Sequence, residues 1–250
     1  MISFVKKNLC FIIILVVFGL VGGYFTALYS IESLSAEIVD ELVAQVGSIE
    51  IGCAIITIQS LVYALALGLI GRALAEKLGI WKSSRPSVKS VLSTALVALV
   101  GGTAFILIDA YFFSSFNDAI RNSYLAKPSV NYIIASVTYG GVIEEIMLRL
   151  FFMSLIAFIL MKLSKRDTPT DGQLIAANII AALLFAAGHL PTTFIMIENV
   201  DAMIIFRCFL MNGGFGLAFG HLYRKYGLPY ACLGHAGVHI VSKLIWILFV

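Results

Sequence analysis

Charged residues are scarce in this sequence. Only 12% of its residues are Asp, Glu, Lys or Arg and 60% are hydrophobic, whereas a soluble domain is usually about 25% charged. The mean hydropathy is +1.00. This composition excludes an ordinary soluble domain and is typical of a polytopic membrane protein. The sequence also lacks a nucleic-acid-binding signature, so we expect no nucleic-acid partner.

Cysteine and the common soluble catalytic motifs are equally sparse. The four cysteines lie in apolar segments and form no CxxC pair, which predicts small buried or lipid-facing side chains rather than a redox or metal site; they are Cys10, Cys53, Cys208 and Cys232. No HExxH, no GxSxG and no Gly-rich phosphate loop in a strand–helix context is present. The familiar zinc-protease, serine-hydrolase and nucleotide-binding motifs are therefore absent.

Long apolar runs dominate the chain, and each is long enough for a transmembrane helix of about 20 residues. We predict seven spans, at about 8–30, 51–71, 90–114, 131–161, 172–190, 202–221 and 229–249. The first resembles a signal peptide, but its apolar run continues to about residue 30, so we interpret it as a helix that stays attached. The predicted fold is an all-α polytopic bundle forming one domain over residues 1–250.

Two of the predicted spans are unusual in length. The fourth is long, which predicts a tilted or protruding helix. The fifth is short and ends at Pro191, where a helix stop or kink is expected. A broken or re-entrant segment in that region, giving an eighth span, is the alternative.

The loops between these spans alternate in charge. One set carries twelve Lys and Arg residues and comprises the N-terminus, 72–89, 162–171 and 222–228. The other set carries two, with most of the acidic residues, and comprises 31–50, 115–130 and 191–201. The positive-inside rule therefore predicts a cytoplasmic N-terminus and an outside C-terminus. We expect an integral protein of a bacterial plasma membrane.

Six ionisable residues other than histidine fall inside the predicted spans: Asp109, Glu144, Glu145, Arg149, Arg207 and Lys243. A charge at the bilayer centre costs at least about 2.5–3.5 kcal/mol on insertion scales. Asp109, Arg207 and Lys243 lie nearer the span ends, so we predict that they snorkel toward the interface. The cluster at 144–149 is in the middle of a span, which favours a functional role.

Helix geometry separates the residues of this cluster. In "GGVIEEIMLRLFF" Glu145 precedes Arg149 by four residues, the spacing and order that favour an ion pair on one helix face. Glu144 has Leu148 at the same spacing, so it receives no local cation and is a candidate general base. A helix-packing salt bridge is the alternative, and it leaves Glu144 unexplained.

Three of the four histidines also lie within the spans. His235 and His239 share a helix face at the i, i+4 spacing, which is also a metal-ligand geometry. His189 closes the fifth predicted span, and we interpret His221 as interfacial. By these spans Glu144 lies near mid-membrane, His235 toward the cytoplasm and His189 toward the outside, so they converge only if the fifth helix is shorter or shifted.

These residues form three ordered motifs. "EEIMLR" matches EExxxR, "FAAGH" matches FxxxH at Phe185 and His189, and "HAGVH" matches an HxxxN-type motif at His235. In this order on successive membrane helices they resemble the CPBP family of CAAX proteases and bacteriocin-processing enzymes, also called Abi proteins, which includes the type II CAAX prenyl endopeptidases. The resemblance covers about residues 130–245. His239 stands where the family often has Asn.

The resemblance implies a glutamate-dependent intramembrane endopeptidase. Glu144, assisted by His189, would activate a water molecule, and His235 with His239 would stabilise the tetrahedral oxyanion. Donors preorganised in a water-excluded site suit that task. The implied substrate is a membrane-associated, prenylated or leader peptide, reached within the lipid bilayer.

The remaining implied roles concern support and metal. Glu145 and Arg149 would hold the site together. The favoured mechanism requires no cofactor. The alternative is a zinc protease in which His189, His235 and His239 bind Zn²⁺ and a carboxylate activates the bound water.

Two further hypotheses assign no peptide cleavage to the chain. One is a non-enzymatic immunity or regulatory membrane protein on the same scaffold, which would function without Glu144. The other is a proton-coupled transporter, because intramembrane Glu, His and Arg also build proton relays. Inverted repeats would support a transporter, and the sequence shows none.

Overall fold

The computed structural model of the chain describes residues 2–82, 85–197 and 199–250. Within these residues there are helices but no strands, and seven helices are long and apolar enough to cross a membrane. They are Asn8–Ser33, Ile49–Lys77, Val88–Ser115, Val130–Leu163, Asp171–Met196, Ala202–Tyr226 and Leu228–Phe249. The predicted all-α polytopic bundle is confirmed, with seven spans and no eighth in the described part of the chain.

Several spans combine more than one helical element. The first three are α1 (Ile2–Ser33), α3 (Ile49–Lys77), and α4 (Val88–Leu107) followed by η1 (Ile108–Phe112) and η2 (Phe113–Ser115). The fourth is α6 (Val130–Ala135), η3 (Ser136–Glu144), η4 (Ile146–Met153) and α7 (Ser154–Leu163). The fifth is α8 (Asp171–Gly188) with α9 (Leu190–Met196). The sixth is α10 (Ala202–Cys208), η5 (Phe209–Gly214) and α11 (Phe215–Tyr226). The seventh is α12 (Leu228–Phe249).

Short polar side chains set where the helices begin. Ser35, Ser48, Ser129 and Thr170 each accept a hydrogen bond from a backbone N–H three residues later, which satisfies a donor that the helix itself leaves free. Two of the connecting segments fold into short helices, α2 (Ala36–Val46) and α5 (Asp118–Ser123). The charge pattern that identified these segments as loops gave no sign of their helices.

The prediction that the fifth span ends at residue 190 is wrong. His189 closes α8, and the chain continues directly into α9 with Pro191 in its first turn. A proline is tolerated there because the first backbone N–H groups of a helix have no intrahelical partner. The span therefore runs for 26 residues to Met196, and His189 lies inside it rather than at its end.

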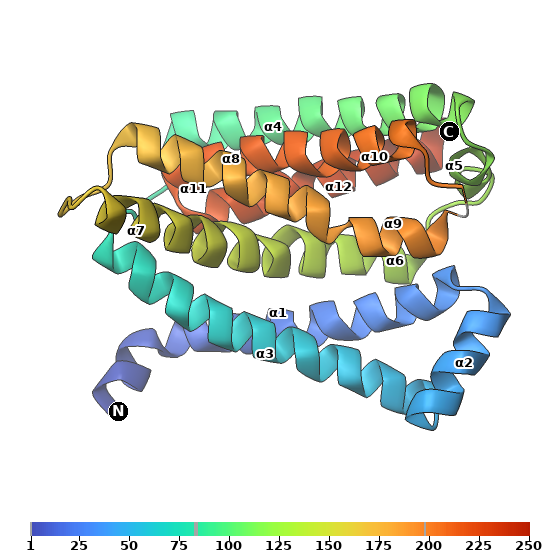
Figure 1. Ribbon diagram of the computed structural model, residues 1–250, viewed down its shortest axis with the longest axis horizontal. Coiled ribbons are helices and arrows are strands. Elements are labelled where there is room, and N and C mark those ends of the chain that lie inside the picture. The colour runs from blue at the N-terminus through green and yellow to red at the C-terminus, as the bar shows by residue number, and fades with distance from the viewer. Residues whose placement is uncertain (1, 83–84, 198) are drawn as a thin grey trace.

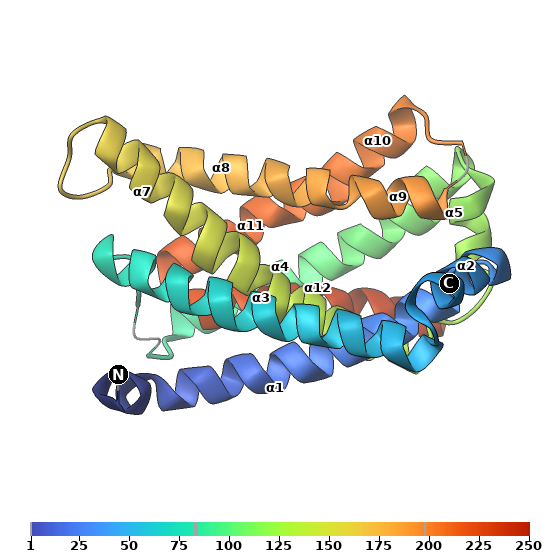
Figure 2. The same cartoon turned by 60° about the horizontal axis from the view of Figure 1, so that its bottom comes forward.

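The fourth span occupies the middle of the molecule. It is the most buried of the seven spans. It lies between the α1–α3 pair and the helices α4, α8, α11 and α12, as Figures 1 and 2 show. A Cβ added to Gly141 would lie 2.7 Å from Cβ of Ala236, so the bare glycine lets η3 pack directly on α12. This contact brings the cluster at 144–149 beside the histidines of α12.

The central part of the fourth span is not α-helical. Both η3 and η4 are π-helical, and π-helical turns also occur in η1 and η5. Such turns are rare and are frequent at functional sites. The α-helical periodicity used on the sequence did not predict them.

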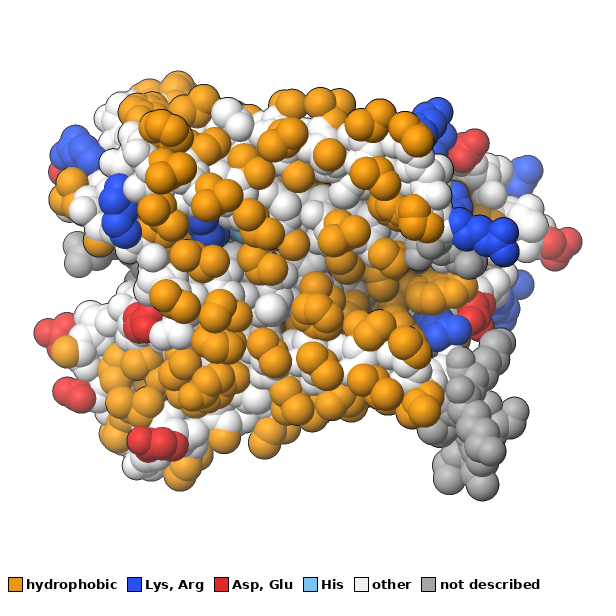
Figure 3. Space-filling model, turned by 180° about the vertical axis from the view of Figure 1, so that it is seen from behind, with side chains coloured by type: hydrophobic (Ala, Val, Ile, Leu, Met, Phe, Trp, Pro, Cys, Tyr) orange, Lys and Arg blue, Asp and Glu red, His pale blue; other side chains and the backbone are white. Residues whose placement is uncertain are grey.

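A broad hydrophobic surface separates two ends at which charged side chains gather, as the space-filling view in Figure 3 shows. Many large aliphatic side chains among the described residues are exposed, including Leu92, Leu96, Ile58 and Leu183. This surface is compatible with a bilayer, whose hydrocarbon core is about 30 Å thick.

Candidate active site

Glu145 is fully buried at the junction of η3 and η4. Its Oε1 lies 3.1 Å from Nη1 of Arg149, and neither side chain is more than 1% exposed. This is the pair that the four-residue spacing predicts. Glu144 is 18% exposed and has no such cation beside it. One carboxylate of the two is therefore neutralised within its own helix, and the other is directed to the histidines.

Arg149 makes further contacts besides its ion pair with Glu145. Its Nη2 donates to the carbonyl of Gly216 at 2.9 Å, and its guanidinium lies 4.9 Å and 5.7 Å from the ring centroids of Phe185 and Phe219. A Cβ on Gly216 would lie 2.9 Å from that Nη2. The bare glycine at this point of the sixth span therefore makes room for the arginine.

His235 connects the two glutamates. Its Nδ1 lies 2.9 Å from Oε1 of Glu145, and its Nε2 lies 4.0 Å from Oε2 of Glu144. The ring stacks on Phe219 with a centroid distance of 4.3 Å. An ionised carboxylate only accepts hydrogen bonds, so Nδ1 carries the proton and the neutral ring presents an unprotonated Nε2 to Glu144.

His189 approaches the same carboxylate from α8. Its Nδ1 lies 2.9 Å from the carbonyl oxygen of Phe185, and its Nε2 lies 3.8 Å from Oε1 of Glu144. A carbonyl also only accepts, so this imidazole likewise presents an unprotonated Nε2 when neutral. The expected difference in depth between His189 and His235 is absent, because the fifth span extends beyond His189.

His239 completes the group. Its ring stacks on His235 with centroids 4.9 Å apart. Its Nε2 lies 3.1 Å from the position that a Cβ on Gly140 would take, and Oε2 of Glu144 lies 3.8 Å from the same position. Gly140 thus keeps the space beside both groups open. Gly140 has no role in the sequence analysis, because nothing local to η3 indicates that His239 faces it.

The prediction that Asp109, Arg207 and Lys243 snorkel is wrong. Asp109 and Lys243 are only 3% and 4% exposed. Arg207 donates to both oxygens of Asp109, at 2.5 Å from Nε and 2.6 Å from Nη2. Tyr124 donates to Asp109 at 2.7 Å. Burial, reinforced by Asp109, raises the pKa of Tyr124, so this hydroxyl remains protonated and keeps donating.

The arrangement of the histidines bears on the zinc alternative. Among the residues that the structure describes, no three His, Cys, Asp or Glu side chains are arranged to hold one ion. His235 and His239 stack on one another with ring centroids 4.9 Å apart. The Nδ1 hydrogen bonds of His189 and His235 leave each Nε2 free, which is also how a metal-ligating histidine is held. The three histidines of the zinc hypothesis therefore lie close together beside Glu144, and zinc binding stays a prediction.

A comparison with protein families identifies the region that contains this cluster. The match is to the Rce1-like family model, whose description is "Type II CAAX prenyl endopeptidase Rce1-like". It covers residues 126–241, which include all six predicted site residues. No curated protein and no solved structure matches the chain. The resemblance drawn from the three motifs is confirmed. The family match, together with the seven apolar spans, indicates an integral membrane protease.

Proposed function

We propose that this chain, with its Rce1-like region at residues 126–241, is an intramembrane endopeptidase in which Glu144 activates a water molecule. One observation carries the proposal. The carboxylate of Glu144 and the unprotonated Nε2 of His189 face each other at 3.8 Å. Both groups accept hydrogen bonds, and neither can donate to the other. A water molecule between them donates one hydrogen to each, which orients its oxygen lone pairs toward a substrate.

The proposed reaction steps follow from the positions of these groups. The water oxygen attacks the carbonyl carbon of the scissile peptide bond, and Glu144 takes the proton that the water loses. The carbonyl oxygen becomes an oxyanion, which His235 and His239 stabilise. When the C–N bond breaks, the proton returns from Glu144 to the departing amine. The products are a new carboxylate and a new amine, and the enzyme is unchanged.

Glu145 and Arg149 act on this reaction through His235. The hydrogen bond from Nδ1 of His235 to Glu145 fixes the orientation of the ring. A protonated His235 donates from Nε2, the atom that lies toward Glu144. Arg149 lies 3.1 Å from the same Glu145 oxygen, which holds the carboxylate in place.

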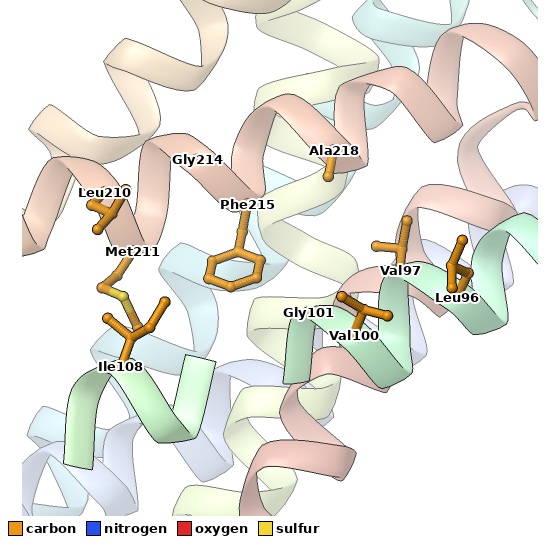
Figure 4. A pocket seen from close by; sticks show the side chains of 10 residues that line it. All are labelled: Leu96, Val97, Val100, Gly101, Ile108, Leu210, Met211, Gly214, Phe215 and Ala218. Carbon is orange, nitrogen blue, oxygen red and sulfur yellow. The ribbon is translucent and has the colours of Figure 1, made fainter. Parts of the chain in front are cut away.

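The substrate class follows from where the cluster lies. It is within the membrane spans, so a peptide must be presented from the membrane. A groove of about 370 Å³ lies between α4 and the η5–α11 segment, and its lining includes Val97, Gly101, Met211 and Phe215 (Figure 4). The ring of Phe215 lies 5.6 Å from that of Phe105, which lies 6.4 Å from that of His239. An apolar anchor such as a prenyl group fits this lining.

The test uses purified wild type and Glu144→Ala in detergent, each incubated with prenylated and other membrane-anchored peptides, with and without a chelator. We expect cleavage by wild type alone, unaffected by chelation. Loss of cleavage on chelation, restored by zinc, would replace the metal-free mechanism with the zinc one. Equal cleavage by both proteins would remove Glu144 from the chemistry. No cleavage by folded wild type would favour the non-enzymatic hypothesis.

The expected orientation places the N-terminus in the cytoplasm. The twelve-to-two distribution of Lys and Arg between the two sets of loops supports it. Cysteine accessibility to a membrane-impermeant reagent, in variants with one cysteine in either set of loops, tests it. Labelling of the 72–89 loop from outside intact cells would reverse the orientation.

A further inference from the structure

Lys243 is a buried cation to which the proposed mechanism gives no role. It lies in α12 at the same helical spacing that separates His235 from His239, so the three side chains share one face. It is 4% exposed. None of the ion pairs among the described residues includes it. A buried cation without a carboxylate is costly in a membrane span, so its neighbours should show what it does.

Two groups face the ammonium of Lys243. The ring of Tyr132 lies 4.1 Å from Nζ, within the range of a cation–π contact. Nδ1 of His239 lies 3.4 Å from Nζ, at the long end of the hydrogen-bonding range. An ammonium group has three donors and no acceptor. While Lys243 is protonated, Nδ1 of His239 can only accept, and the ring proton of a neutral His239 is then on Nε2.

This makes His239 different from the other two imidazoles of the site. His189 and His235 use Nδ1 to donate, to a carbonyl and to a carboxylate. When neutral they present an unprotonated Nε2 to Glu144. His239 instead presents an Nε2–H while it is neutral, beside Gly140 and on the side where Oε2 of Glu144 also lies.

We propose that Lys243 is a positioning residue that holds His239 as its Nε2–H tautomer, and so supplies the neutral oxyanion donor of the endopeptidase. This inference rests on the proposed function. It also accounts for a histidine at the position where the resembled family often has Asn, since an amide N–H is a neutral donor too. The ammonium polarises the ring and strengthens the Nε2–H as a donor.

The tautomer can be measured without turnover, by NMR of protein labelled with ¹⁵N-histidine. The chain has only four histidines, and His239→Asn identifies the His239 signals. In wild type we expect a protonated Nε2 and an unprotonated, hydrogen-bonded Nδ1. In Lys243→Met the Nδ1 resonance should move to the position of a free acceptor or show protonation, while Lys243→Gln, which keeps a donor, should retain the wild-type pattern.

Two NMR results would overturn the proposal. A protonated Nδ1 in wild type would mean that a neutral Lys243 accepts from His239. An Nδ1 resonance unchanged in Lys243→Met would mean that the lysine does not determine the tautomer. Neither result depends on cleavage, so a wild type that cleaves nothing would remove the proposed function and still leave the pairing of Lys243 with His239 decided.

Kinetics then test whether the tautomer matters. Removing a full oxyanion donor costs about 10²–10³ in kcat, so weakening one through Lys243→Met should lower kcat by about tenfold with KM unchanged. In the His239→Asn background the same substitution should have little further effect, because no Nδ1 remains. An equal loss in both backgrounds would overturn the route through His239. Lys127→Met, at an exposed lysine, is the control.

Discussion

The buried charges around Asp109 and those around Glu144 differ in how completely their polar groups are hydrogen-bonded. Around Asp109 both carboxylate oxygens accept from Arg207, and Tyr124 adds a third hydrogen bond. Around Glu144 the nearest partners are Nε2 atoms of two histidines at 3.8 Å and 4.0 Å. We call the Asp109 cluster closed, because both carboxylate oxygens are hydrogen-bonded. We call the Glu144 cluster open, because its carboxylate faces other acceptors.

The difference shows that a charge within a membrane span does not by itself indicate chemistry. The Asp109 cluster ties α10 to η1 and to the connecting helix α5, a structural task that leaves no group free to react. In the Glu144 cluster, one of two adjacent glutamates has a structural role and the other is available for chemistry. Glu145 is neutralised by Arg149 and supports His235, while Glu144 remains available to take a proton.

The largest loss of stability should come from removing Arg149, which pairs with Glu145 in the open cluster. Arg149→Leu leaves Glu145 buried without its cation, and breaking one partner of a buried pair costs about 3–5 kcal/mol. We expect this loss in the free energy of unfolding in detergent, together with loss of cleavage. Arg121→Leu removes an exposed ion pair with Asp118 and should change stability by less than about 1 kcal/mol. Similar losses in the two variants would contradict the account.

Breaking the closed cluster should affect stability and spare catalysis. Asp109→Asn leaves Arg207 without its carboxylate, and because the arginine is 24% exposed, we expect a cost near the lower limit for buried pairs, about 3 kcal/mol. The folded fraction should cleave peptide at close to the wild-type rate, measured per folded molecule. The double variant Asp109→Asn, Arg207→Gln should recover part of the stability.

A smaller loss of stability is expected when the space that Gly216 leaves for Arg149 is filled. Gly216→Ala places a Cβ 2.9 Å from Nη2 of Arg149, and overpacking of this kind costs about 1–3 kcal/mol. We expect lower stability and slower cleavage, since the guanidinium must move. In Gly214→Ala the nearest atom is 4.0 Å away, so this variant should resemble wild type. A loss in Gly214→Ala as large as in Gly216→Ala would indicate a general effect on the helix.

The smallest effect on the fold should come from Gly140→Ala. Its Cβ would lie 3.1 Å from Nε2 of His239, where a shift of a few tenths of an ångström relieves the contact. We expect nearly unchanged thermal unfolding and a reduced kcat, because the donor moves away from the developing oxyanion. Gly188→Ala, which meets nothing within 4 Å, is the control. Unchanged kinetics in Gly140→Ala would place His239 outside the reaction.

Local patterns were sufficient to predict the spans and the Glu145–Arg149 pair. Hydropathy gave seven spans because each apolar run is long enough to be recognised alone, and the ion pair followed from a four-residue spacing. The site histidines were found through their motifs. Their convergence was uncertain, because the position of His189 depends on whether Pro191 ends a helix or begins one.

The features that the sequence did not predict depend on contacts between distant segments. Asp109 and Arg207 are 98 residues apart, so each alone resembled a residue that snorkels. Lys243 faces Tyr132 of another helix, and Gly140 faces His239 of α12. The π-helical turns of η3 and η4 likewise have no signature in the apolar periodicity.

The central claim is that the open cluster performs chemistry and the closed cluster does not. Its most direct test is the cleavage rate per folded molecule of Glu144→Gln and Asp109→Asn on one peptide. We expect Glu144→Gln, which keeps the shape and removes the base, to lose about 10²–10⁴ in rate with stability retained, and Asp109→Asn to lose stability with its rate retained. Retained cleavage in Glu144→Gln, or an equal loss of rate in both variants, would contradict the claim.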